Sequence, residues 1–226
     1  MAWFSCSLFM GFLDGLRTPV PVVLYALCLR YLGNSLRKVA KALEPFILVS
    51  HVAVWLWEKR LWGFRDVFAS RCRVSLFLID DTEVKIGGSS AWFFIAYEPF
   101  ERRILGMWLS WTKNQLVVEK FLRELVRRFG RHPVYTDGGS HYLAACKSLG
   151  LEHRVYRFGS WMHEVIESVI CTKIKDMTRV FDNYFPCRRK NCMLEHIWSW
   201  MKLRILFQEE WVKEMLRRLV GVIKIE

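Results

Sequence analysis

The chain has 226 residues, of which 53% are hydrophobic and 25% are charged, a balance that excludes an intrinsically disordered chain and supports a sizeable core. The formal net charge of +12 favours anionic partners such as nucleic-acid phosphates or anionic lipid. Seven cysteines without regular spacing indicate free thiols in a reducing compartment rather than a disulfide framework.

The apolar stretches near the N terminus are interpreted as core segments. Residues 1–16 form an apolar tail that lacks the basic start of a secretory leader and is interrupted by Asp14. The runs Val20–Leu29 and Phe46–Trp57 are shorter than the roughly 20 residues that a bilayer-spanning helix needs. We therefore expect no membrane association.

Three short amphipathic helices are predicted after this tail. The first covers Pro19–Leu32, the second covers Ser35–Leu43, and the third begins at Ser50 and ends at Arg60. Ser35 and Ser50 precede their helices at positions where a hydroxyl can cap the first turn. Short helices with tight links and basic ends are typical of a helix-turn-helix, and an ordinary three-helix packing unit has the same pattern.

Two apolar runs in the middle of the chain end at aspartates. Val74–Ile79 is followed by Asp80 and Asp81, and Pro133–Thr136 is followed by Asp137. An apolar run that stops at an acid is typical of a buried strand that brings a carboxylate to a sheet edge. Such acids either bind a divalent metal ion or act as turn and helix-cap residues.

The remaining periodicity predicts an α/β domain with a ribonuclease H-like mixed sheet and flanking helices. After the first strand, the expected elements are strands at Ala91–Tyr97 and Arg103–Ser110, a helix at Asn114–Phe129, a strand at Pro133–Thr136, a helix at Ser140–Leu149, a strand near His153–Tyr156 and a helix at Trp161–Lys175. Three antiparallel strands followed by alternating helices and strands are the element order of that fold.

The last of these helices offers a third carboxylate. Glu164 and Glu167 lie one turn apart on the same helix face, and either could approach the two aspartates. Three carboxylates suit phosphodiester chemistry, because two Mg²⁺ ions about 3.5–4 Å apart can activate a water or 3′-hydroxyl and stabilise the leaving oxygen.

The motifs together resemble the small insertion-sequence transposases of the DDE type found in bacteria and archaea. The matching residues are IDDT (Ile79–Thr82) with KIGG (Lys85–Gly88), VYTDGG with Tyr142 after it, LGLEH (Leu149–His153), KDMTRVFDNYFPC (Lys175–Cys187) and CMLEHIWSWM (Cys192–Met201). They occur in the family's order, and with the helical N terminus the resemblance covers residues 20–205.

The resemblance implies that Asp80, Asp137 and Glu167 are the catalytic carboxylates and metal ligands, with Glu164 as the alternative to Glu167. Asp81 lies where the family commonly has glutamate and is not expected to be a ligand. The match is poorest at the third acid, where the family has an acid followed by Arg and this chain has Glu167-Ser168. This acid is about one residue too far from Lys175, a shift that turns a helical side chain by roughly 100°.

The resemblance also implies a domain plan and a function. The expected parts are the tail (1–16), a helix-turn-helix DNA-binding domain (17–66), a ribonuclease H-like DDE catalytic domain (72–205) and a C-terminal amphipathic helix (206–226). The implied activity is binding of insertion-sequence ends followed by strand cleavage and strand transfer with two Mg²⁺ or Mn²⁺ ions. A relative that only binds DNA and has no catalytic activity is the alternative.

The implied partners are terminal inverted repeats and target DNA, in a cytoplasmic, nucleoid-associated homodimer. The residues expected to contact DNA are basic or lie at the start of the recognition helix: Ser50, His51, Arg60, Lys173, Lys175 and Arg179. A solvated charged face is the alternative for the basic run from Lys173 to Arg179.

Two further features have two interpretations each. Cys187, Cys192 and His196 have a spacing that fits either a loose structural zinc site or reduced core thiols. Trp161 either stacks on a flipped base or packs in the core, as most of eleven tryptophans are expected to do.

Overall fold

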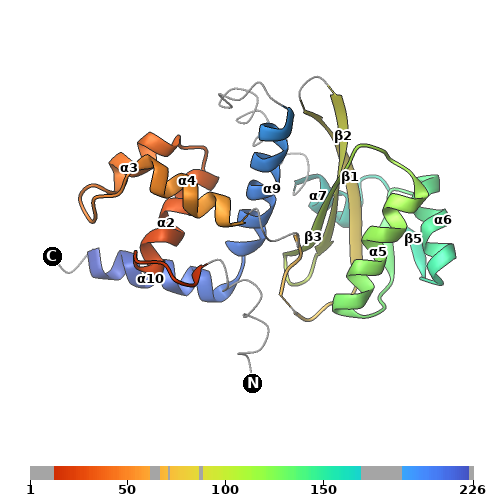
Figure 1. The fold of residues 1–226 in the computed structure, drawn as a ribbon. Coiled ribbons are helices and arrows are strands. Elements are labelled where there is room, and N and C mark those ends of the chain that lie inside the picture. Colours follow the sequence, from red (N-terminus) through yellow and green to blue (C-terminus); the bar gives the residue numbers. More distant parts are fainter. Residues whose placement is uncertain (1–12, 62–66, 71, 87–88, 169–189, 224–226) are drawn as a thin grey trace. The chain divides into compact units, whose positions relative to one another are not determined.

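The computed structural model describes residues 13–61, 67–70, 72–86, 89–168 and 190–223, and the chain divides into two compact units (Figure 1). The helical unit combines residues 1–70 with residues 194–226, and the α/β unit spans residues 71–193. Across the described ranges, no helix is both long and apolar enough to cross a bilayer.

The helical unit contains the three predicted N-terminal helices. They are α2 (Val20–Tyr31), α3 (Leu36–Leu43) and α4 (His51–Arg60). The hydroxyl of Ser35 accepts a hydrogen bond from the Lys38 N–H at 3.3 Å, and that of Ser50 accepts one from the Ala53 N–H at 3.1 Å. The predicted caps of α3 and α4 are thus confirmed.

The core of the helical unit joins the two ends of the sequence. Leu203 of α9 (Lys190–Leu206) and Val212 of α10 (Glu210–Ile223) are buried in one cluster with side chains of α2, α3 and α4. The grouping differs from the predicted boundaries, which assigned residues up to 205 to the catalytic domain and made 206–226 a separate helix. The apolar pattern of a helix does not specify which partner covers it.

The α/β unit is built on a five-stranded sheet of order β3-β2-β1-β4-β5. The strands are β1 (Phe77–Ile86), β2 (Ser89–Glu98), β3 (Arg103–Ser110), β4 (Val134–Thr136) and β5 (His153–Val155). The first three pair antiparallel, while β4 pairs parallel with β1 and β5 parallel with β4. This order confirms the predicted ribonuclease H-like fold class.

One expectation about β1 is wrong. The sequence predicted a strand that stops at the acids, whereas β1 is continuous to Ile86 and contains both Asp80 and Asp81. The strand continues because Thr82, Val84 and Ile86 are buried in alternation with exposed residues. The aspartates therefore lie within a strand rather than at its end.

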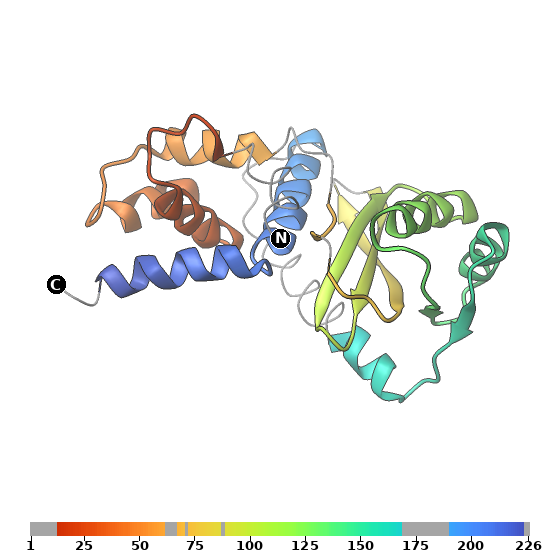
Figure 2. The same ribbon diagram turned by 90° about the horizontal axis from the view of Figure 1, so that it is seen from below.

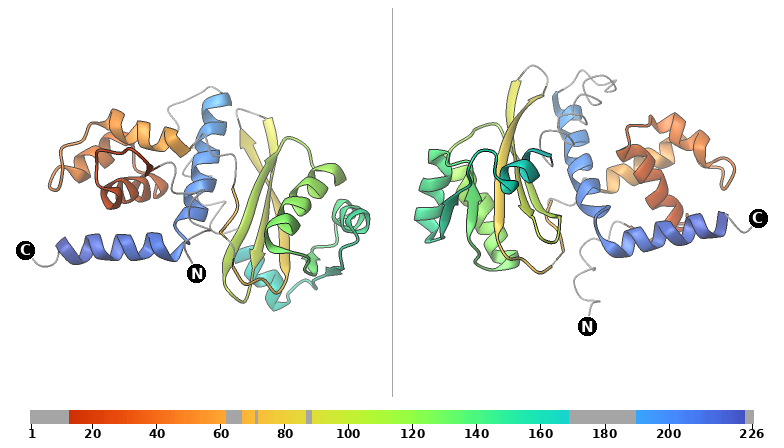
Figure 3. Two further views of the ribbon diagram at one scale, coloured as in Figure 1. Left: turned by 60° about the horizontal axis from the view of Figure 1, so that its bottom comes forward. Right: turned by 180° about the vertical axis from the view of Figure 1, so that it is seen from behind.

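The helices of this unit lie on both faces of the sheet. Helices α5 (Gln115–Phe129) and α6 (Ser140–Leu149) cover one face, and α7 (Trp161–Glu167) lies on the other (Figures 2 and 3). The predicted extension of α7 to Lys175 lies outside the described residues.

Candidate active site

The side chains of Asp80 and Asp81 lie on opposite faces of β1. Asp81 is paired with Phe94 of β2, whose ring lies 6.5 Å from that of Phe121 in α5. Directly paired residues point to the same face and consecutive residues to opposite faces. Asp81 therefore faces α5 and α6, and Asp80 faces the side where α7 lies.

Asp80 of β1 and Asp137, the residue directly after β4, lie side by side. The parallel pairing of β1 with β4 places Phe77 opposite Val134 and Leu78 opposite Tyr135. Asp80 and Asp137 each follow that last pair by two residues, so the register brings both carboxylates to the same level and the same face. The structure thus brings together two of the three predicted carboxylates.

The surroundings of Asp80 strongly raise the pKa of its carboxyl group. Partial burial raises its pKa to about 6, and the negative charges of Asp137 and Asp81 add to the rise. A hydrogen bond of 2.8 Å from the Asp81 N–H to Asp80 Oδ1 and the charge of Lys113 act in the opposite direction. A half-buried carboxylate beside other acids is a suitable ligand for a divalent cation, which would offset the repulsion.

Asp137 is held at the start of a glycine turn. Its Oδ1 accepts a hydrogen bond from the Gly139 N–H at 3.0 Å, while the Gly138 N–H donates to Thr136 Oγ1 at 3.1 Å. Gly138 has a φ of +92°, a conformation that residues with a Cβ rarely adopt. The turn interpretation of Asp137 is thus correct for one oxygen, and the exposed carboxylate is still able to bind a metal ion.

Asp81 is fixed on the other face of the sheet. The Tyr142 hydroxyl of α6 donates to Asp81 Oδ1 at 2.6 Å, and Lys113 Nζ lies 2.8 Å from Oδ2. The Asp81 side chain is only 2% exposed, and Lys113 also lies over the Trp92 ring. These contacts engage both carboxylate oxygens of Asp81 and tie β1 to the starts of α5 and α6.

The two glutamates of α7 differ in their surroundings. Both are exposed, but the charge of Glu167 is one of those that act on the buried Tyr156 hydroxyl. Burial and the charges of Asp80, Asp137, Asp81 and Glu167 together raise the Tyr156 pKa. Glu167 Oε1 also lies 3.7 Å from His163 Nε2.

The three predicted ligands are not gathered around one point. Among the residues that the structure describes, no three His, Cys, Asp or Glu side chains are close enough together to hold a metal ion. Asp80 and Asp137 are neighbours, and the charges of both, like that of Glu167, act on the Tyr156 hydroxyl.

Sequence reasoning did not identify two residues of this site. Tyr156 directly follows β5, whose Val155 pairs with Thr136, so it lies level with Asp137. The position of Tyr156 directly after β5, the third of the parallel strands, could have identified it from the sequence. Lys113 lies in the loop before α5, and no sequence pattern connects it with Asp81.

The predicted DNA-contacting residues of the helical unit lie on or beside α4. Ser50 is the cap of α4, His51 is exposed, and Arg60 Nη1 donates to the Asp14 carbonyl at 2.8 Å. The exposed side of α4 also includes Val52 and Leu56.

Other predicted site residues fall outside the described part of the chain. These are Lys173, Lys175, Arg179 and Cys187, and for Cys192 and His196 only the backbone of α9 is described. DNA contacts by the basic run and a zinc site both stay predictions.

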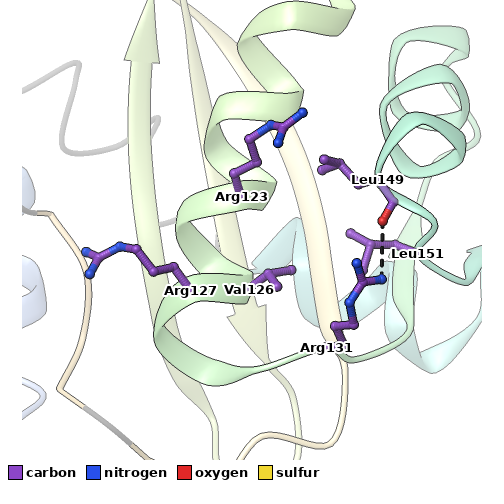
Figure 4. A pocket seen from close by; sticks show the side chains of 6 residues that line it. All are labelled: Arg123, Val126, Arg127, Arg131, Leu149 and Leu151. Atoms are coloured by element: carbon purple, nitrogen blue, oxygen red, sulfur yellow. Dashed lines mark hydrogen bonds between the residues drawn. The ribbon is translucent and has the colours of Figure 1, made fainter.

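A pocket of about 240 Å³ lies between α5 and the turn that follows α6 (Figure 4). Its lining residues are Arg123, Val126, Arg127, Arg131, Leu149 and Leu151. Arg131 Nη1 donates to the carbonyls of Leu149 and Gly150 at 3.2 and 3.1 Å, which satisfies the C-terminal end of α6. None of the predicted site residues lines this pocket.

Three solved structures resemble the chain at low identity. The catalytic core domain of BIV integrase is 14% identical, with 56% of this chain and 83% of that chain covered and a TM-score of 0.40. The HTLV-2 integrase catalytic core domain in complex with magnesium is 14% identical, with 55% of this chain and 84% of that chain covered and a TM-score of 0.40.

The simian T-cell lymphotropic virus intasome in complex with PP2A regulatory subunit B56 gamma contains a chain that is 10% identical. The match covers 77% of this chain and 67% of that chain, with a TM-score of 0.42. Similarity at this level carries no information about function, and the fold assignment rests on the strand order.

The sequence comparison is more decisive. No protein-family model matches the chain. Uncharacterized protein MJ0017 of Methanocaldococcus jannaschii is 30% identical over 202 residues, which are 88% of this chain and 90% of that protein. The chain therefore belongs to the same family as uncharacterized protein MJ0017.

Proposed function

We propose that the protein is a DDE-type transposase, which binds insertion-sequence ends and catalyses metal-dependent DNA strand cleavage and strand transfer. The supporting observation is the pair Asp80 and Asp137, level on neighbouring parallel strands and on the sheet face where α7 lies. Two carboxylates so placed, with a glutamate on the adjacent helix, form a donor set for phosphodiester chemistry.

The chemistry of the donors fits Mg²⁺ or Mn²⁺. Carboxylate oxygens are the hard ligands that these ions prefer, and Asp80 has a pKa of about 6 because burial and acidic neighbours disfavour its charge. Lys113 forms its ion pair with Asp81 on the opposite face, and the effect of its charge on Asp80 is smaller than that of burial. In this proposal Asp80, Asp137 and Glu167 would hold two ions, which would supply Lewis-acid activation of a water or 3′-hydroxyl.

The protein's own side chains position these ligands. The contacts of Asp81 with Tyr142 and Lys113 hold the middle of β1 against α5 and α6, and thereby fix the direction of Asp80. Tyr156 is buried directly after β5, level with Asp137, and its hydroxyl is protonated at neutral pH and can donate a hydrogen bond. Glu167 is the preferred third ligand because it lies 3.7 Å from His163 Nε2, and the His163 ring is 6.1 Å from that of Tyr156, on which the charges of both aspartates also act.

The helical unit is the proposed DNA-reading part. In this proposal α4 is the recognition helix of a helix-turn-helix, with exposed His51 at its start and Arg60 at its end. The net charge of +12 supports binding to a phosphate backbone. Lys173, Lys175 and Arg179 would contact DNA near the carboxylates, and a homodimer would bring two element ends together.

The test is strand transfer by the purified full-length protein on a labelled duplex that carries the inverted repeat flanking its gene. Reactions with Mg²⁺, Mn²⁺ or EDTA compare wild type with Asp80→Asn, Asp137→Asn, Glu164→Gln and Glu167→Gln. Glu83→Gln is the matched control, because Glu83 is an exposed acid of β1 on the face opposite Asp80.

We expect metal-dependent products from wild type and Glu83→Gln, and at least hundredfold lower rates for Asp80→Asn, Asp137→Asn and Glu167→Gln. Loss in Glu164→Gln in place of Glu167→Gln would reassign the third ligand. Salt-sensitive DNA binding with no cleavage under any metal condition would instead identify a relative that only binds DNA.

A further inference from the structure

Three aromatic side chains stand exposed around the N-terminal end of α7. Phe100, in the turn between β2 and β3, is 63% exposed, Phe158 is 90% exposed, and Trp161 is 48% exposed. The Phe100 and Trp161 rings contact each other with centroids 5.8 Å apart. We call these three residues the aromatic rim.

The aromatic rim is connected to the carboxylate site through His163. The His163 ring lies 4.4 Å from that of Phe158 and 6.1 Å from that of Tyr156. Its Nε2 lies 3.7 Å from Glu167 Oε1, and Tyr156 is the residue on which Asp80, Asp137 and Glu167 all act. Phe158 is therefore one side chain, His163, away from Glu167, the proposed third metal ligand.

Arginines flank the aromatic rim in the sequence. Arg157 immediately precedes Phe158, and Arg102 follows Phe100 by two residues in the same turn; both arginines are exposed. Guanidinium groups attract phosphates, and proteins that bind single-stranded nucleic acid combine such positive charges with exposed aromatic faces.

We propose that the aromatic rim binds unpaired bases of DNA beside the carboxylate site. Bases within a duplex are stacked on one another and present no free face, so the occupant is a single-stranded end or an extruded base. The identification of the polymer as DNA rests on the proposed function. The aromatic rim adds to the proposed function a preference for substrates whose bases are unpaired next to the reacting phosphodiester.

The experiment measures fluorescence anisotropy of a labelled oligothymidine and of a blunt duplex, titrated with the full-length protein in EDTA so that no strand is cut. The variants are Phe100→Ala, Phe158→Ala and Trp161→Ala. Leu116→Ala is the matched control, because Leu116 is an equally exposed apolar residue, 67% exposed, on α5. Phe158→Tyr and Phe158→Leu separate stacking from apolar contact.

We expect each alanine variant to bind oligothymidine at least about fivefold more weakly, since alanine substitution of a base-stacking aromatic costs roughly 1–3 kcal/mol. Phe158→Tyr and Leu116→Ala should bind within about twofold of wild type, and Phe158→Leu should be as weak as Phe158→Ala. Affinity for the blunt duplex should not change, because the proposed function assigns duplex binding to the helical unit. The exposed positions of all three residues make misfolding of the variants an unimportant risk, which circular dichroism checks.

The result is independent of the catalytic test. Weakened oligothymidine binding in the variants supports the proposal even when no protein preparation transfers strands. Unchanged affinity in all three variants overturns it even when the wild type is an active transposase. Unchanged affinity together with a smaller particle by light scattering would show that the rim joins two copies of the chain, and would also overturn the proposal.

Discussion

Replacement of Lys113 by methionine leaves the Asp81 carboxylate buried without its cation. Lys113 Nζ lies 2.8 Å from Asp81 Oδ2, and the two side chains are 29% and 2% exposed. Removing one partner of a fully buried ion pair costs about 3–5 kcal/mol. Lys113 retains contact with water, and the Tyr142 hydroxyl still donates to Asp81, so we expect a loss of about 2 kcal/mol in the free energy of unfolding.

A second substitution tests the cause of this loss. In the Lys113→Met, Asp81→Asn double variant the isolated charge is gone, so the protein should regain at least about 1 kcal/mol relative to Lys113→Met. The measurement is urea unfolding of the full chain followed by circular dichroism with linear extrapolation.

The control is Lys120→Met, at an exposed position of α5, which should change the free energy of unfolding by less than about 0.5 kcal/mol. A Lys113→Met variant as stable as this control would refute the ion pair. A double variant no more stable than Lys113→Met would show that the isolated charge is not what destabilises the protein.

The remaining predictions concern Asp80, Gly138 and Ser50. The pKa of Asp80 is raised to about 6 in the folded chain, above the unfolded value of about 3.9, so the folded state binds more protons and stability falls as pH rises from about 4 to 6. In EDTA, wild type should therefore lose about 2 kcal/mol of stability across this window relative to Asp80→Asn, and parallel urea-unfolding curves would contradict this. Gly138→Ala should lower the free energy of unfolding by about 1–2 kcal/mol, because φ is +92° and the new Cβ would lie 3.1 Å from Val155 Cγ1. Gly159→Ala is the comparison, since its φ is +73° but a new Cβ would meet nothing within 4 Å. Thermal unfolding should show a smaller loss of stability for Gly159→Ala. Ser50→Ala should cost about 1 kcal/mol by loss of the α4 cap, Ser50→Asp should retain the stability, and equal unfolding midpoints for the two variants would be the contrary result.

Local patterns were sufficient where the determining contacts are close in the sequence. The cap of α4 depends on Ser50 and Ala53, which are three residues apart, and the alternation of β1 depends on successive residues. The fold class followed from the succession of elements, because few topologies satisfy short right-handed connections. The fold class and the positions of Asp80 and Asp137 at neighbouring strands were therefore predictable.

The strand length of β1 was not predictable from charge alone. Two consecutive aspartates look like the end of a buried strand, since an unpaired buried carboxylate is costly. The strand continues through them because Lys113 and Tyr142, 32 and 61 positions further along the chain, meet Asp81 on the covered face.

The remaining features depend on contacts between distant segments. Tyr156 joins the two aspartates only because β5 pairs in register with β4, and the exposed aromatic rim forms because the β2–β3 turn meets the start of α7. Leu203, Leu206 and Val212 pack with α2, α3 and α4 because those helices leave an apolar surface that α9 and α10 cover. Sequence periodicity shows that a helix has an apolar surface, but it does not show which other surface covers it. The partner is the one that gives the whole chain the lowest free energy, and only the folded structure shows which one that is.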